Sequence, residues 1–203
     1  MFYIGVDLGQ RRDYSAIAVV ERRERQATEW RERGEPALVV RHLERIRLGT
    51  PYTEVARRVV EVARHPTLAG QRTLVVDATG VGMPVVDMLR ASQPACALMA
   101  VMIAGGEGER SDGRVWHVGK VDLLAGVQML LEQGELRIAK GMREAGTLVR
   151  EMASVKVRYR GSGRAQLGAE GVGEHDDLEI AVALACWAGR KGKVGERRER
   201  LFW

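Results

Sequence analysis

The sequence predicts an α/β fold with a five-stranded mixed sheet flanked by helices. Three apolar segments, 2–8, 15–21 and 37–48, follow one another as strand patterns before any helical pattern begins. After them, up to residue 106, helical and strand patterns alternate, as in parallel strands joined by crossover helices. A late segment, 174–191, is apolar on nearly every side, which indicates a buried helix.

The first three strands are expected to form an antiparallel meander. A short polar loop, GQRRDY, joins the first two segments at hairpin distance. The charged stretch 22–36 is a long exposed turn, and apolar alternation returns in the third strand.

The parallel part of the sheet begins after a change of period. Helical spacing of Val55, Val59 and Val62 predicts a helix over 50–65. A strand ending at Asp77 in RTLVVD follows, and the other elements are a helix over 83–92 and an almost wholly apolar strand over 97–106, as expected of a strand buried on both faces.

The second half of the chain adds elements to this core. Their predicted order is a flexible loop (107–114), a helix (117–134), a short strand (135–138), a helix (143–154) and an added β-hairpin turning at GSG (155–169). No repeat or linker divides the chain, so we expect one domain over 1–190 and a charged C-terminal tail over 191–203.

Composition excludes several classes of protein. With 203 residues, 45% of them hydrophobic and 29% charged, the sequence is typical of one globular domain, and no apolar stretch reaches the roughly 20 residues that span a bilayer. There is no secretory signal pattern, so we expect a cytoplasmic protein without membrane contact.

Cys96 and Cys186 fit neither a disulfide framework nor a zinc site. The net charge of +5 weakly favours a polyanionic partner, although an arginine-rich solvated surface explains it equally well.

Carboxylates stand where a scaffold would carry apolar residues. Asp7 lies in the first strand, Asp77 ends the strand after the first helix, and Asp176 and Asp177 open the buried helix in EHDDLEIAVALA. The first strand and the strand ending at Asp77 are the natural neighbours at the parallel junction. We therefore expect Asp7 and Asp77 to lie together.

Each aspartate alone also fits a structural role. Asp7 fits a turn cap, Asp77 fits a strand end that engages the amides of ATGVG, and Asp176 or Asp177 fits the positive end of a helix dipole. The glycines after Asp7 and Asp77 allow phosphate binding, but the GxxxxGK[ST] pattern of a P-loop is missing.

Taken together, the carboxylates predict a metal site. Several carboxylates at one sheet edge repel one another unless cations neutralise them. Mg²⁺ and Mn²⁺ take oxygen ligands, and two such ions about 4 Å apart clamp both the attacking and the leaving oxygen of a phosphodiester. This repulsion favours a nuclease over a phosphate-binding loop.

Four motifs resemble one family in order and spacing. The segments GVDLGQRRDYSAIAVV, LVVDATGVGMPVVDMLR, VGKVDLLAGVQMLLEQGELRI and EHDDLEIAVALA look like the nuclease domain of tailed-bacteriophage terminase large subunits. The resemblance runs from about residue 3 to residue 188. It implies a ribonuclease H-like fold and an endonuclease that uses two Mg²⁺ or Mn²⁺ ions to cut concatemeric viral DNA during genome packaging, in the cytoplasm of the host cell.

The resemblance also assigns residues. The metal-binding and catalytic aspartates of the family fall on Asp7, Asp77 and Asp176, with Asp177 beside it as a ligand or an outer partner. Periodicity does not choose between Asp176 and Asp177, although Asp176 is favoured. Lys120 matches a basic position that approaches DNA, or is simply an exposed helix lysine.

The hairpin is a candidate DNA-binding arm because phosphate contacts give affinity without sequence preference. A merely soluble surface hairpin is the alternative. Its cations are Lys156, Arg158, Arg160 and Arg164.

One departure concerns the packaging motor. A complete large terminase has an ATPase domain, and these residues carry no Walker motif. Expected partners are double-stranded DNA, a terminase small subunit, a portal and an ATPase domain absent from this chain. Alternatives are a Holliday-junction-resolvase-like nuclease of the same superfamily, a phosphotransferase of the actin and sugar-kinase type, and a non-catalytic DNA-binding packaging module.

Overall fold

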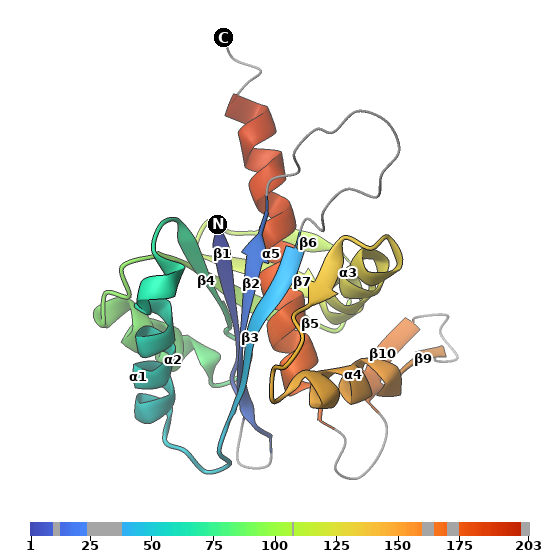
Figure 1. The fold of residues 1–203 in the computed structure, drawn as a ribbon, viewed down its shortest axis with the longest axis horizontal. Coiled ribbons are helices and arrows are strands. Elements are labelled where there is room, and N and C mark those ends of the chain that lie inside the picture. Colours follow the sequence, from blue (N-terminus) through green and yellow to red (C-terminus); the bar gives the residue numbers. More distant parts are fainter. Residues whose placement is uncertain (10–12, 24–37, 107, 160–164, 170–174, 200–203) are drawn as a thin grey trace.

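The protein is a layered α/β structure, seen in a computed structural model that describes all residues except 10–12, 24–37, 107, 160–164, 170–174 and 200–203 (Figure 1). In the described part of the chain the main sheet has eight strands in the order β6-β7-β5-β4-β1-β2-β3-β8. The strands are β1 (Phe2–Asp7), β2 (Ser15–Arg22), β3 (Leu38–Ile46), β4 (Arg72–Asp77), β5 (Ala97–Ala104), β6 (Glu109–Ser111), β7 (Val115–Gly119) and β8 (Leu136–Ile138).

The helices cover both faces of this sheet. They are α1 (Tyr52–Ala63), the short 3₁₀ helix η1 (Pro66–Leu68), α2 (Gly82–Ala91), α3 (Lys120–Glu132), α4 (Ala145–Ser154) and α5 (Asp177–Glu199). Figure 1 shows α1 and α2 on one side of the sheet and α3, α4 and α5 on the other. A separate two-stranded sheet pairs β9 (Val155–Tyr159) with β10 (Ala165–Ala169), which confirms the predicted hairpin.

The predicted meander and parallel junction are both confirmed. β2 pairs antiparallel with β1 and with β3, whereas β4 pairs parallel with β1 and with β5. The predicted loop GQRRDY and turn 22–36 lie largely outside the described residues.

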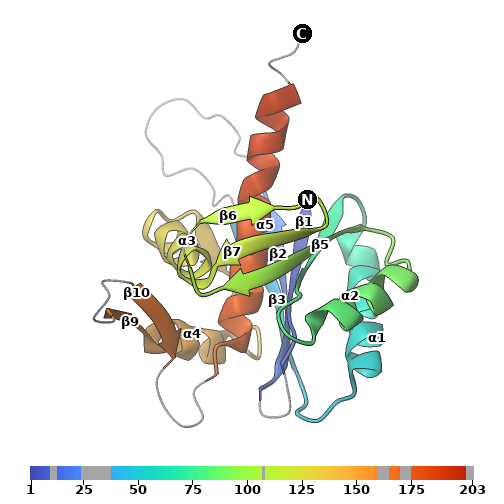
Figure 2. The same ribbon diagram turned by 180° about the vertical axis from the view of Figure 1, so that it is seen from behind.

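The strand count differs from the predicted five. The predicted flexible loop contains β6, and the predicted helix over 117–134 begins only at Lys120, because Val115–Gly119 forms β7, parallel to β5 (Figure 2). Val115 and Val118 are buried there, and this short apolar strand precedes the helical pattern too closely to be separated by period alone. β8 adds in parallel to the opposite edge, beside β3.

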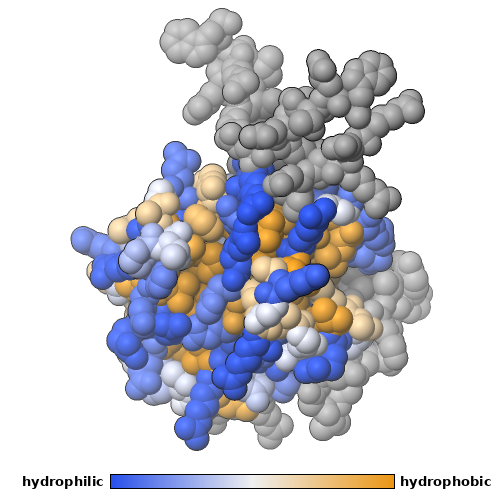
Figure 3. All heavy atoms as spheres, viewed as in Figure 1, coloured by the Kyte–Doolittle hydropathy of each residue, from blue (hydrophilic) through white to orange (hydrophobic). Residues whose placement is uncertain are grey.

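Alternate residues of the central strands supply two cores. Ile4, Val6 and Leu74 face α1 and α2, whereas Tyr3 and Val75 face α5, and all five are nearly inaccessible to water. This is the period-2 alternation of a sheet covered on both faces. On the face in Figure 3, hydrophilic residues lie along the rim and over the middle, with hydrophobic residues between them.

The buried helix α5 crosses β1 at very close range. A Cβ atom at Gly5 would lie 1.9 Å from the carbonyl oxygen of Ala181, so only glycine fits there. Ala183 and Ala185 are also fully buried on this helix, and small residues let backbones approach. α5 continues through Glu199, beyond the predicted end of the helix at 191. Among the described residues, we find no helix of the length and apolarity needed to cross a membrane.

Candidate active site

Asp7 and Asp77 lie side by side at the carboxyl ends of β1 and β4. The parallel register pairs Val6 with Val76, so the next residue on each strand is an aspartate. Both residues are half-buried, and the charge of Asp77 is among the causes that raise the pKa of Asp7. The adjacency that the strand order predicts is therefore present.

The turn after β4 orients Asp77. The backbone N–H and the hydroxyl of Thr79 donate to Oδ1 of Asp77 at 2.8 and 2.5 Å, and the N–H of Ile103 donates to the Thr79 hydroxyl at 2.9 Å. A Cβ at Gly82 would lie 2.3 Å from the carbonyl oxygen of Asp77, so this turn also requires glycine. One oxygen of Asp77 is thus engaged by the turn.

The start of α5 brings the second pair of carboxylates to this edge. Asp177 is buried and Asp176 is partly exposed. Burial, followed by the charges of Asp77, Asp177 and Asp176, raises the pKa of Asp7 well above its usual value. The four predicted aspartates therefore form one electrostatic cluster, although they come from three distant segments.

Lys120 faces this cluster from the first residue of α3. Its ammonium nitrogen lies 2.5 Å from Oδ2 of Asp176, and its charge lowers the pKa of Asp7. Lys120 therefore lies beside the aspartates.

Three further charged residues surround Asp177, and we did not predict them from the sequence. Arg45 is ion-paired with Glu151, and its Nη2 lies 3.4 Å from Oδ2 of Asp177. Glu179, in the first turn of α5, is buried, and its Oε2 has no hydrogen-bond partner. Burial raises the pKa of Glu151 and Glu179 to about 7 and that of Asp177 to about 6.

The sequence did carry a signal for these residues. Glu179 interrupts the apolar run LEIAVALA, and a charge inside a buried helix requires a partner. Its neighbours are not local, however, because Glu151 and Arg45 are far away in sequence.

His175, the residue before Asp176, lies 3.8 Å from both Asp13 and Asp177, at the edge of the cluster. The remaining predicted residues belong to the hairpin. Lys156 and Arg158 are positions of strand β9. Arg160 and Arg164 lie outside the described residues.

The donor set fits a hard divalent cation. All four aspartates offer oxygen ligands of the kind that Mg²⁺ and Mn²⁺ prefer, and burial together with the neighbouring aspartate charges raises the pKa of Asp7, a cost that a bound cation would offset. Across the described residues, no three His, Cys, Asp or Glu side chains converge as ligands on one point. Oδ2 of Asp176 faces Lys120, and Oδ2 of Asp177 faces Arg45.

Comparison with known proteins identifies the fold. Neither a protein-family model nor a curated protein matches the sequence. Several solved structures match, and they include nuclease domains of large terminases. The large terminase nuclease of thermophilic phage G20c with bound magnesium is 22% identical, with a TM-score of 0.63, over 92% of this chain and 80% of that chain.

Two more distant structures show the same fold. A variant nuclease domain of the large terminase subunit gp2 of bacterial virus Sf6, with manganese and beta-thujaplicinol, is 15% identical, with a TM-score of 0.65, over 91% of this chain and 87% of that chain. The human cytomegalovirus terminase nuclease domain, soaked with manganese, is 13% identical, with a TM-score of 0.53, over 92% and 82%. The predicted ribonuclease H-like fold is confirmed.

Proposed function

We propose that this chain, which has the fold of large terminase nuclease domains, is a metal-dependent DNA endonuclease that cuts concatemeric viral DNA during genome packaging. The observation that carries the proposal is the clustering of Asp7, Asp77, Asp176 and Asp177 at one sheet edge, where burial and then the charges of the other three aspartates raise the pKa of Asp7. A scaffold gains nothing from such an arrangement, whereas a divalent cation site requires it.

Each side chain has a distinct part in this proposal. Asp7, Asp77 and the Asp176–Asp177 pair would hold two Mg²⁺ or Mn²⁺ ions, which when bound supply an activated water and stabilise the departing 3′ oxygen. Thr79 holds one oxygen of Asp77 in place. Asp177 is the more buried of the α5 pair, while Asp176 is the one that Lys120 contacts.

The proposed substrate is double-stranded DNA. Lys120 provides a cation beside the aspartates, where a phosphodiester would lie, and the β9–β10 hairpin with Lys156, Arg158, Arg160 and Arg164 is the proposed backbone-binding arm. A terminase small subunit, a portal and an ATPase domain are the proposed partners, in the cytoplasm of the host cell. The proposed domain covers 1–190, followed by the charged segment 191–203.

Plasmid cleavage tests this proposal. Supercoiled plasmid incubated with the protein should be nicked and linearised in Mg²⁺ or Mn²⁺ and left intact in EDTA. The Asp7→Asn protein should lose this activity, whereas Asp87→Asn, which changes an aspartate on α2 that is 69% exposed, should retain it. Metal-dependent nicking that persists in Asp7→Asn would contradict the assignment.

The same preparation separates the rival functions. A resolvase-like nuclease would prefer four-way junctions over linear duplex. A non-catalytic packaging module would bind DNA in a salt-sensitive manner without any metal-dependent cleavage. Thermal stabilisation by nucleotide would favour the phosphotransferase.

A further inference from the structure

Asp177 is held by a cation from another part of the sheet. The Arg45 guanidinium, at the end of β3, contacts both Glu151 on α4 and Oδ2 of Asp177. The side chain of Arg45 is 17% exposed, that of Glu151 5% and that of Asp177 4%, so the guanidinium lies between two carboxylates that water scarcely reaches. Removing one partner from such a buried set leaves an uncompensated charge, which is far more costly than breaking a surface ion pair.

Glu151 anchors this cation to the first turn of α5. Its Oε1 accepts from Arg45, and its Oε2 accepts the backbone N–H of Glu179 at 2.9 Å. The first N–H groups of a helix have no partner within the helix, so Glu151 caps α5 from a different helix. It therefore fixes both Arg45 and the helical turn that carries Asp177.

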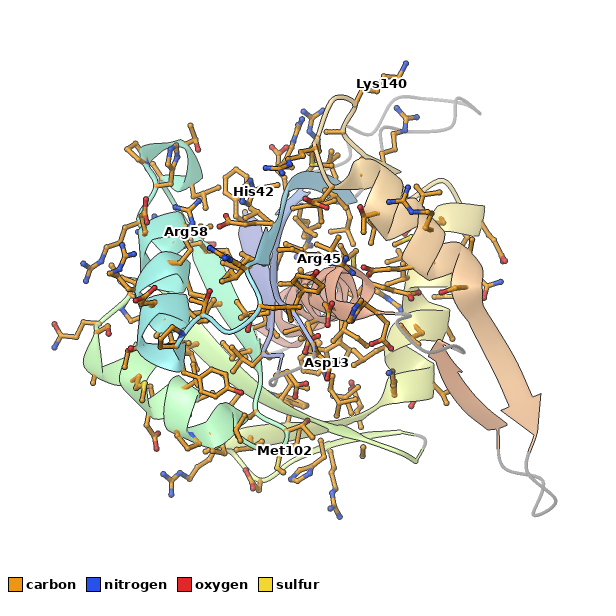
Figure 4. All side chains as sticks on the ribbon, turned by 90° about the horizontal axis from the view of Figure 1, so that it is seen from below. Asp13, His42, Arg45, Arg58, Met102 and Lys140 are labelled. Atoms are coloured by element: carbon orange, nitrogen blue, oxygen red, sulfur yellow. The ribbon has the colours of Figure 1, made fainter. Side chains whose placement is uncertain are left out.

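An aromatic side chain restrains Arg45 further. The guanidinium carbon lies 4.8 Å from the centroid of the Tyr14 ring, which packs edge-on against His175 at 5.1 Å. Figure 4 looks onto this edge of the sheet and shows Arg45 beside the start of α5, with Asp13 nearby. Contacts with Glu151 of α4, Asp177 of α5 and the Tyr14 ring leave the guanidinium little freedom to move.

We infer that Arg45, anchored by Glu151, is a positioning residue of the metal site that holds Asp177 in its ligand orientation. This inference rests on the proposed nuclease function. Arg45 forms an ion pair with Oδ2 of Asp177 at 3.4 Å, an oxygen that accepts no hydrogen bond, and this charge attraction restrains the carboxylate before any cation binds. Side chains that orient metal ligands in this way typically contribute about 10–100-fold to metal affinity or activity.

The test compares two variants of the full chain. Arg45→Gln removes the cation that faces Asp177. The double variant Arg45→Gln/Glu151→Gln removes the Arg45–Glu151 ion pair as a whole, so Glu151 is not left as an unpaired buried charge and the fold is retained, but nothing holds Asp177. For each we expect kcat for plasmid nicking to fall about 10–100-fold with KM for DNA within about twofold, and the calorimetric Kd for Mn²⁺ to rise by a similar factor.

Arg58→Gln is the matched control. Arg58 lies on α1, at the opposite face of the sheet. It makes a bidentate ion pair with Glu44 of β3, at 2.8 and 2.9 Å. We expect its kcat and Mn²⁺ affinity to equal those of the unmodified protein.

Two outcomes separate failure of this inference from failure of the proposed function. If the double variant melts as a folded protein and binds Mn²⁺ with unchanged affinity, Arg45 has only a structural role and the inference is overturned. If the unmodified protein binds Mn²⁺ but cuts no DNA, the nuclease proposal fails, and the calorimetric comparison alone decides whether Arg45 positions Asp177.

Discussion

Without divalent metal, the protein should be less stable at pH 8 than at pH 5. Burial raises the pKa of Asp177 from 3.8 to about 6 and the pKa of Glu151 and Glu179 from 4.5 to about 7. A carboxyl group whose pKa is raised on folding binds more protons folded than unfolded, so it favours folding at low pH. That contribution is lost as pH rises through the folded-state pKa, here between about 4 and 8.

The size of the effect follows from the shifts. A difference of about 2 pKa units in one group corresponds to about 3 kcal/mol of unfolding free energy. Because the charges of Asp177, Glu151 and Glu179 interact, their costs are not independent, and we take the cost of one glutamate as the smallest expected difference. Part of that cost is already present at pH 5, above the unfolded-state pKa of 4.5, so about 2 kcal/mol falls between pH 5 and pH 8. For a chain of this length, this corresponds to a melting-temperature difference of about 4–8 °C.

Calorimetric melting in EDTA at pH 5 and pH 8 measures this difference. The lower limit of pH 5 avoids the surface carboxylates with lowered pKa values, such as Glu44 near 2, which lose stabilising charge only under stronger acid. Glu179→Gln removes one buried charge and should flatten the dependence. An unchanged or higher melting temperature at pH 8 in EDTA would refute the reasoning.

Three further changes test the site. Gly5→Ala would place a Cβ 1.9 Å from the carbonyl oxygen of Ala181, so calorimetry should show a loss of about 1–3 kcal/mol in unfolding free energy, and an unchanged melting temperature would contradict the close packing of α5 on β1. Thr79→Val removes the hydroxyl donor to Asp77 and should lower kcat for nicking about 10-fold or more, with a normal rate counting against an orienting role. Lys120→Ala should reduce the salt dependence of duplex binding by about one phosphate contact, measured by anisotropy, whereas an identical slope would place Lys120 away from DNA.

Local patterns were sufficient to predict the centre of the fold. The strand patterns ending at Asp7 and Asp77 and the parallel crossover between them predicted their adjacency, because parallel neighbours end at the same edge. The buried helix was equally clear from its all-round apolar character. The short strand β8 was predicted at 135–138, but the edge strands β6 and β7 were missed, since three to five residues carry little periodic signal and pairing with a distant strand decides them.

The contacts of Arg45 and Glu151 around Asp177 could not be predicted from the sequence. Arg45 and Glu151 are 106 positions apart, and no local pattern pairs them. Their meeting depends on α4 packing beside α5 and on β3 ending at the same edge as β1 and β4. The aspartates could be predicted because like charges in apolar segments are unusual, whereas the side chains that orient them emerge only from the tertiary fold.

Anomalous scattering from crystals soaked in Mn²⁺ tests the central claim most directly. We predict two peaks about 4 Å apart among the oxygens of Asp7, Asp77 and the Asp176–Asp177 pair, and their loss in Asp7→Asn crystals. Mn²⁺ peaks only at other positions, with none beside Asp7 and Asp77, would contradict the assignment of this sheet edge as a metal-dependent nuclease site.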